Sequence, residues 1–285
     1  MSRINKHVLM SDAHYFDDSA PINAYMGKHE PIDKQRAQEE HDSIRAALQT
    51  AGVTVQTVPA PAACQDGVYT ANWALVRGDI AVMSRLPSAR QAEEAYATQV
   101  LQALGKAIIT VPDDLKFSGQ GDALFCGDYL FVGSNYRTDP AVHDFLAETF
   151  GCQVVGVEAV PVLDHAGQPV INASSGWPDS LFYDIDLAIA VLSPTLIAWC
   201  PEALTPESQA KIRELPIDKI EVSLHEATTA FACNLVSTGE TVVMSAHAPH
   251  FKKAVEAHGL NVITPYISEL AKGGGYIRCT TLTLD

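Results

Sequence analysis

A repeated unit runs through this 285-residue chain and limits what it can fold into. Two short apolar runs are joined by a tight turn, as at Gly78-Asp79 and Gly127-Asp128. Gly-Asp between β-rich runs is a strong hairpin signal. Two further hairpins are expected, with turns at Ser193-Pro194 and Gly239-Glu240. A period of roughly 45–65 residues indicates an array of small supersecondary units.

Helical stretches and a further strand complete the unit. Four of the helical stretches end at a glycine, the usual residue just past a helix: Gly52, Gly105, Gly151 and Gly259. A short apolar strand follows each, and residues 207–223 repeat the same order without the glycine. Five such units without a linker predict a ring of small mixed sheets with helices outside, in one domain over residues 1–285. The alternative, a doubly wound parallel sheet, requires long crossovers where this sequence has tight hairpins.

Composition narrows the range of partners and cofactors. The net charge of -15 argues against nucleic acid and anionic membranes. It mainly indicates solubility, with a cationic substrate as the alternative explanation. No two of the six cysteines form a C-x-x-C pair, so neither a zinc site nor a disulfide scaffold is indicated. His247 and His250 lack a third ligand and are interpreted as loop residues. No metal and no cofactor is predicted.

The cellular context is predicted from the apolar segments. The first residues contain no long apolar run followed by small residues, so no signal peptide is expected. No window reaches the apolar length needed to span a bilayer. The chain is therefore expected to be cytoplasmic, and a homo-oligomer stays open.

Seven short segments, in order, resemble the pentein superfamily, most closely its amidinotransferase and dimethylarginine dimethylaminohydrolase (arginine dihydrolase) family. They are INAYM (22–26), YTANWALV (69–76), SRLPSARQAEE (84–94), GQGDALF (119–125), SNYRTD (134–139), FYDIDLA (182–188) and KGGGYIRCTTLTL (272–284). The resemblance covers nearly the whole chain. It implies a five-bladed, pseudo-symmetric α/β propeller of ββαβ-type repeats, with the active site on its central axis.

The resemblance also implies a reaction. In this family a cysteine thiolate attacks the central carbon of a guanidinium or amidine, an amine leaves, and water releases the covalent intermediate. Cys279 stands at the family's nucleophile position. Because a free thiol has a pKa of about 8.5, it is mostly protonated at neutral pH, and a cationic substrate beside the sulfur would favour the thiolate. A buried structural cysteine is the alternative, but the glycine run at 273–275 favours the nucleophile because it permits close backbone approach.

Substrate-binding residues are expected at the matching motif positions. A guanidinium is a flat cation with up to five N–H donors, so its partners should be carboxylate or amide oxygens. Asp122 and Asp186 are expected to supply the carboxylates, with Asn72 as a neutral acceptor. Arg90 and Arg137 match family arginines that hold a substrate carboxylate. The alternatives are a turn residue at Asp122 and a surface charge at Arg90.

Two more matched positions, Asn23 and Ser118, are assigned to the substrate site by the same resemblance. Ser118 stands where the family usually has Glu, and Asp184 stands where it has the His that acts as general acid and base. Asp184 and Asp186 would share one face of a strand, which raises the pKa of one of them. Asp184 could then transfer protons in place of the His, or bind a more highly charged or differently shaped substrate.

His14 is the other candidate base, with an exposed loop histidine as the alternative. Two functions are therefore carried forward. The first is a cysteine-dependent hydrolase of a small cationic or zwitterionic guanidine or amidine, consistent with the glycine-rich terminus and Cys279. The second is a catalytically silent pentein that binds a ligand or a partner protein, consistent with the missing Glu and His.

Overall fold

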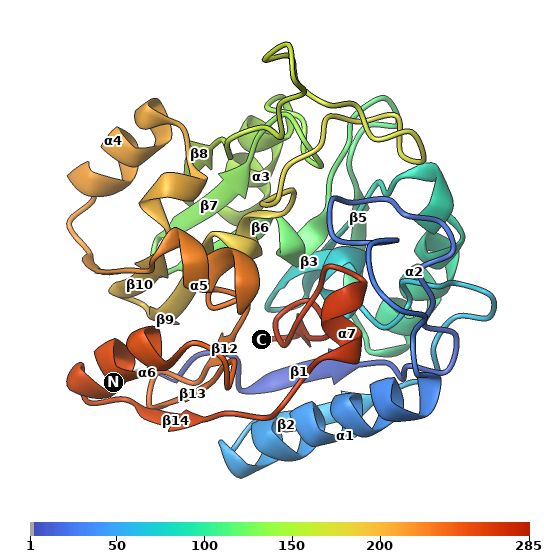
Figure 1. Cartoon of the computed structure of the whole chain (residues 1–285), viewed down its shortest axis with the longest axis horizontal. Helices are drawn as coiled ribbons and strands as arrows, with labels where there is room; N and C mark the ends of the chain where they lie inside the picture. Colours follow the sequence, from blue (N-terminus) through green and yellow to red (C-terminus); the bar gives the residue numbers. More distant parts are fainter. Residues whose placement is uncertain (1–2) are drawn as a thin grey trace.

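Five small sheets form a ring with helices around it (Figure 1). The computed structural model describes residues 3–285. The five sheets are β15–β1–β2 (Leu282–Thr283, His7–Met10, Thr54–Thr57), β3–β4–β5 (Ala74–Arg77, Ile80–Met83, Ala107–Thr110), β6–β7–β8 (Ala123–Cys126, Tyr129–Gly133, Gln153–Val157), β9–β10–β11 (Ile189–Ser193, Leu196–Trp199, Asp218–Glu221) and β12–β13–β14 (Val236–Ser237, Thr241–Val243, Asn261–Ile263). The helices α1 (Lys34–Thr50), α2 (Ala92–Ala103), α3 (Val142–Phe150), α4 (Pro206–Glu214) and α6 (Pro249–Ala257) join the second and third strands of these sheets.

Every sheet has the same pairing. Its first strand runs antiparallel to the middle strand, and its third strand runs parallel to it after the helical crossover. A tight hairpin suffices for the first connection, whereas the parallel connection needs the helix. Gly151 follows α3 with φ 59°, a conformation that suits a residue without Cβ. The predicted five-bladed α/β propeller of ββαβ units is confirmed, and the doubly wound alternative is wrong.

One blade is built from both ends of the chain. β15 pairs antiparallel with β1, with Val8 opposite Thr283, and β2 pairs parallel with β1. This is why the sequence shows only four contiguous hairpins. Closure of the ring draws the C-terminal segment to the centre of the molecule, where Figure 1 places the C-terminus. Cys279 lies three residues before β15 and is thereby carried to the axis.

Short 3₁₀ turns precede the first strands of three blades: Thr70–Trp73, Gly119–Gly121 and Ile185–Leu187. The expectation that Asp184 and Asp186 lie on one strand is therefore wrong. Asp184 has an extended backbone and Asp186 lies inside the turn, because strand β9 begins only at Ile189. The tight turn aims the two side chains at separate partners, whereas a strand would have aligned them on one face.

The remaining elements lie between the blades. α5 (Leu224–Thr229) precedes β12, and α7 (Glu269–Lys272) precedes the glycine run. A long connection, residues 158–184, joins β8 to the fourth blade and forms only isolated bridges. No helix among residues 3–285 is long and apolar enough to cross a membrane. The assignment of residues 1–285 to one domain stays a prediction.

Candidate active site

Each blade places one polar residue just ahead of its first strand. These residues are Asn72, Asp122, Asp186, Asn234 and Cys279, each one to three residues before β3, β6, β9, β12 or β15. All five side chains are buried. Because the first strands surround the ring axis, the side chains that precede them converge there. The pseudo-symmetry of the fold is thus what assembles the site.

Cys279 forms hydrogen bonds with two buried side chains, those of Asp186 and Asn234. Its thiol donates to Asp186 Oδ2 at 3.3 Å, and Asn234 Nδ2 donates to Sγ at 3.1 Å. The Asn234 amide oxygen also accepts from the Cys279 backbone N–H at 3.1 Å. Burial, and then the neighbouring charge of Asp186, raise the pKa of the Cys279 thiol well above its usual value. In the free protein the sulfur is therefore a thiol, and it becomes a nucleophile only after losing its proton.

Asn234 was missed from the sequence. The sequence pattern there predicts only a hairpin, yet Asn234 forms hydrogen bonds with both the backbone and the sulfur of Cys279. A signal was present: Asn234 precedes β12 by the same two residues by which Asn72 precedes β3. Aligning the five repeats with one another would have found it.

A second cluster joins Asn72, Ser118 and Asp184. Asn72 Nδ2 donates to Asp184 Oδ2 at 2.7 Å and to Ser118 Oγ at 2.9 Å. A Cβ at Gly121 would collide with the Asn72 amide and come within 2.8 Å of Asp184 Oδ2, so only glycine permits this packing. Asp184 and Ser118, the two departures from the family pattern, thus lie together.

Three buried carboxyl groups gather at this end of the axis. Burial raises the pKa of Asp122, Asp184 and Asp186, and the charge of Asp184 raises the first and third further. Arg137 acts in the opposite direction on Asp184 and is the strongest influence that lowers its pKa. Asp184 Oδ1 and Asp186 Oδ1 are buried without a hydrogen-bond partner in the described residues. Unpaired buried acceptors of this kind are suited to a cation with several N–H donors.

Asp122 has a further, internal function. Its Oδ1 accepts from the Ile185 backbone N–H at 3.0 Å, so it fixes the turn that carries Asp184 and Asp186. A Cβ at Gly133 would overlap the Asp122 carboxylate, so this side chain occupies a space kept open by glycine. The structure therefore places Asp122 beneath the turn, as a support for the other two carboxylates.

The two predicted arginines differ in how they are engaged. Each of the three Arg90 nitrogens donates to the protein: to Glu93, to Asn72 Oδ1 at 2.8 Å, and to the carbonyls of Asp66 and Tyr69. The surface-charge alternative for Arg90 is wrong, because the side chain is buried in an ion pair with Glu93. Its contact to Asn72 fixes which way that amide points.

Arg137 makes fewer hydrogen bonds with the described residues than Arg90 does. One of its nitrogens, Nη2, donates to the Ile22 carbonyl at 2.7 Å. Its guanidinium lies 4.9 Å from the centre of the Tyr183 ring and 5.7 Å from that of Trp177. A planar cation held between aromatic faces keeps its edge available for a bidentate partner.

Asn23 and His14 both lie in the N-terminal segment. Asn23 Nδ2 donates to the Gly273 carbonyl at 3.0 Å, and a Cβ at Gly274, where φ is +84°, would lie 2.6 Å from Asn23 Oδ1. Asn23 thus packs against the glycine run that leads to Cys279. His14 is exposed, and its ring packs edge-on against Tyr15. Among residues 3–285, no hydrogen bond joins His14 to the residues around Cys279.

Metal ligation finds no support in the part of the chain that the structure describes, since no group of His, Cys, Asp and Glu there could hold an ion. His247 is exposed in a loop, and His250 is exposed in the first turn of α6.

Comparison with known proteins agrees with the family that the sequence motifs resemble. Residues 12–284 match the family model of N,N dimethylarginine dimethylhydrolase, eukaryotic. The N(G),N(G)-dimethylarginine dimethylaminohydrolase of Mycobacterium tuberculosis is 31% identical over 96% of this chain and 84% of its own length.

Arginine dihydrolases are also similar. The bifunctional arginine dihydrolase/ornithine cyclodeaminase AgrE of a Nostoc species is 28% identical, and the chain spans 37% of its length. The crystal structure of the N-terminal domain of ArgZ, covalently bound to a reaction intermediate, matches with a TM-score of 0.87 and 26% identity over 98% of this chain and 97% of that one. The family match over almost all of the sequence shows that the chain belongs to the N,N-dimethylarginine dimethylhydrolase family.

Proposed function

We propose that the chain hydrolyses a C–N bond of a small guanidino compound, with Cys279 as the nucleophile. The observation that carries the proposal is the contact of the Cys279 thiol with Asp186 and Asn234, beside two carboxylate oxygens without partners. Those oxygens, Asp184 Oδ1 and Asp186 Oδ1, can accept the N–H groups of a guanidinium. A cation bound there would lie beside the sulfur.

Binding of this cation prepares the nucleophile. Its positive charge offsets the carboxylates that hold the thiol pKa high, so the thiol becomes easier to ionise. The thiol proton passes to Asp186 Oδ2, which already accepts its hydrogen bond. The thiolate then forms an S–C bond to the guanidinium carbon. The amine leaves with a proton as the C–N bond breaks, and a covalent thiouronium-like intermediate remains.

Asp184 is the proposed acid and base of the later steps. Its raised pKa lets it hold a proton for the leaving amine and then accept one from the attacking water. The C–S bond breaks, the thiol is restored, and a ureido product leaves. Asn72 holds Asp184 through Oδ2, so Oδ1 stays available for the exchange.

The substrate is proposed to be amino-acid-like. Arg137 supplies a guanidinium of which one nitrogen is hydrogen-bonded within residues 3–285, and it lies close enough to Asp184 to lower that residue's pKa. A carboxylate on the substrate would pair with it. The names of the relatives, dimethylarginine dimethylaminohydrolase and arginine dihydrolase, are consistent with such a zwitterion. Asn23, Asn72, Ser118 and Asp122 would act by shaping and supporting this site.

A second candidate function is a catalytically silent pentein that binds a ligand or a partner. It is favoured by one specific observation: the Asn72 network contains Ser118 and Asp184, and no histidine. A cytoplasmic location and a homo-oligomeric state stay predictions.

Chloroacetamidine, a cationic thiol reagent shaped like a guanidinium, separates the two functions. We expect it to modify Cys279 at least about 10-fold faster than it modifies glutathione, because the carboxylates bind the reagent beside the sulfur. Neutral chloroacetamide is the control reagent, and the Cys279→Ser variant identifies the modified site by mass spectrometry. If Cys279 reacts no faster than glutathione, the silent alternative is favoured.

A further inference from the structure

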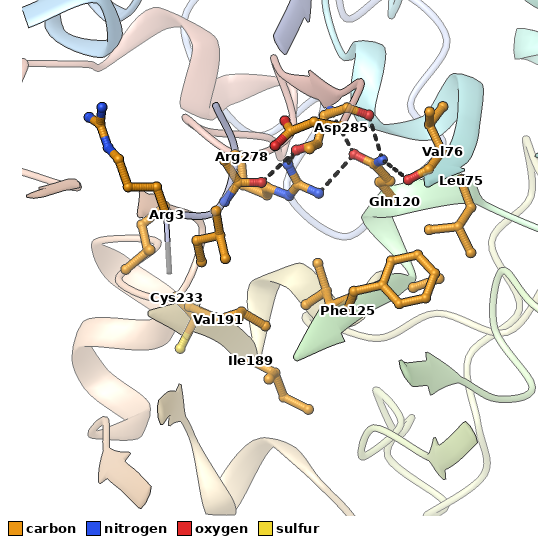
Figure 2. Close-up of a pocket in the computed structure, with 17 residues that line it drawn as sticks. Arg3, Leu75, Val76, Gln120, Phe125, Ile189, Val191, Cys233, Arg278 and Asp285 are labelled. Atoms are coloured by element: carbon orange, nitrogen blue, oxygen red, sulfur yellow. Dashed lines mark hydrogen bonds between the residues drawn. The ribbon is translucent and has the colours of Figure 1, made fainter. Parts of the chain in front are cut away.

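A cavity lies along the ring axis, behind the residues around Cys279. It has a volume of about 170 Å³ and is walled by the first strands β3, β6 and β9, with Cys233 and Leu235 from the segment before β12 and Arg278 and Thr283 near the C-terminus. We call it the rear cavity (Figure 2). None of Asn72, Asp122, Asp184, Asp186 or Cys279 lines it. It is therefore a separate space from the proposed reaction centre.

The main polar feature of the rear cavity is a buried arginine. Arg278 is 8% exposed. Its Nη1 donates to Thr283 Oγ1 at 3.0 Å and its Nη2 to Gln120 Oε1 at 2.9 Å, and both partners are neutral. Within residues 3–285 no carboxylate lies within 4.0 Å of its nitrogens. Because a buried cation without a counter-ion is costly, an anion in the cavity would be stabilised.

Gln120 holds this guanidinium in one orientation. Its Oε1 also accepts from the Thr283 backbone N–H at 2.8 Å, and its Nε2 donates to the Thr283 carbonyl at 2.9 Å. Figure 2 shows these bonds in a row along one side of the cavity. Each terminal nitrogen of Arg278 has two hydrogens and uses one in these bonds, so one remains on each. Two hydrogens from one guanidinium match the two oxygens of a carboxylate.

The opposite wall is apolar. In Figure 2, Ile189, Val191 and Phe125 lie across the cavity from Arg278 and Gln120. Asp285 also borders the cavity, at an exposed position, and its two carboxylate oxygens accept the backbone N–H groups of Lys6 and His7. An occupant thus meets the buried positive charge of Arg278 on one side and hydrocarbon on the other, and the exposed side chains of Arg3 and Asp285 also border the cavity.

We propose that the rear cavity is a second binding site, which takes a small organic monocarboxylate with a flat or short apolar body. The carboxylate pairs with Arg278, and the body packs against Phe125, Ile189 and Val191. The size agrees, because an apolar cavity of about 150 Å³ in a protein holds a molecule as large as benzene. An inorganic anion would leave the apolar wall without contacts. This site is independent of the proposed hydrolysis.

Calorimetric titration with benzoate tests the proposal. Benzamide is the matched probe, since it has nearly the same shape and no charge. We expect benzoate to bind the wild-type chain at least about 10-fold more tightly than benzamide, because only the carboxylate pairs with the buried guanidinium. The titration needs no turnover, so its failure and a failure of the proposed hydrolysis can be told apart.

Two variants locate the binding. Val191→Phe adds a ring inside the rear cavity, and we expect at least about 10-fold weaker benzoate binding because the space is filled. Val262→Phe, at a half-buried valine of β14 that does not line the cavity, is the control and should change the affinity by less than about 2-fold. Three results would overturn the proposal: no benzoate binding up to about 10 mM, equal binding of benzamide, or undiminished binding by Val191→Phe.

Discussion

The two ends of the ring axis carry opposite unpaired charges. At the end that holds Cys279, Asp184 and Asp186 each have a buried oxygen without a hydrogen-bond partner among residues 3–285. At the rear end, Arg278 is buried, and its hydrogen-bond partners in the described part of the chain are the neutral Thr283 and Gln120. The same part of the ring serves both ends, since residues just before the first strands lie around Cys279, whereas residues of β3, β6 and β9 wall the rear cavity together with Gln120 and Arg278.

This contrast shows how a repeated fold can keep a site suited to a cation apart from a site suited to an anion. Arg278 directly precedes Cys279 in the chain, and the positive charge of Arg278 lowers the pKa of Asp186. The carboxylate end is suited to a cation and the arginine end to an anion. If the two ends are separate, substitutions around Cys279 should change the reaction and substitutions in the rear cavity should not.

The largest effect is expected at Cys279, with Cys233 as its control. Cys279 and Cys233 are both buried, one at each end. Cys279→Ser should lower kcat by about 10⁴-fold or more, because the nucleophile is lost. Cys233→Ser should keep kcat within about 3-fold of the wild type, because that sulfur only lines the rear cavity. Steady-state kinetics on a guanidino substrate measures both; equal losses would refute the division.

Asp184→Asn should cause the second-largest loss of kcat. Asn keeps the size and polarity but cannot exchange a proton at neutral pH, so kcat should fall by about 10²–10⁴-fold while substrate still binds. If Asp184 only binds substrate, KM should rise with kcat little changed. Asp184→His restores the family's residue and is the matched rescue. A fully active Asp184→Asn variant would remove both roles and leave His14 as the next candidate base.

Asn234→Ala should have an intermediate effect. It removes the hydrogen bonds to both the sulfur and the backbone of Cys279, so kcat/KM should fall by about 10–100-fold. The control is Asn261→Ala, at an exposed asparagine of β14. Unchanged kinetics in Asn234→Ala would mean that the contact to Cys279 has no part in the reaction.

The pH dependence of alkylation should be steep. Since the pKa of the Cys279 thiol is raised well above its usual value, its reaction with neutral iodoacetamide should quicken about tenfold per pH unit from pH 7 to 9. Cationic chloroacetamidine should react well at lower pH, because it offsets the carboxylate charge. Rates for iodoacetamide that level off below pH 8 would contradict the raised pKa.

The smallest effect concerns stability. Asp186 has a folded-state pKa above its unfolded one, so the stability it contributes is present at acid pH and is lost as pH rises through the folded pKa. Asp186→Asn should therefore raise the Tm by about 2–4 °C at pH 8, and the gain should shrink towards pH 4. Asp128→Asn, at an exposed hairpin turn, is the control. A Tm lowered at pH 8 would show that the carboxylate stabilises the fold.

The sequence by itself predicted the ring and most of the residues that the structure gathers around Cys279. Hairpin turns such as Gly78-Asp79 and helix ends such as Gly151 are local signals, and local backbone preferences suffice to place them. Cys279 and Asp186 were predicted from their motifs, and the structure brings them to 3.3 Å. The repeat also contained the information that would have found Asn234.

Only the tertiary structure decided how those residues are engaged. The 3₁₀ turn at Ile185–Leu187, the use of each Arg90 nitrogen by the protein, and the exposure of His14 depend on neighbours far away in sequence. The same holds for the rear cavity, where Gln120 meets Arg278 across 158 residues. Closure of the ring by β15 against β1 creates both ends of the axis. Burial and pairing of charge are properties of the assembled ring, so no local pattern could have given them.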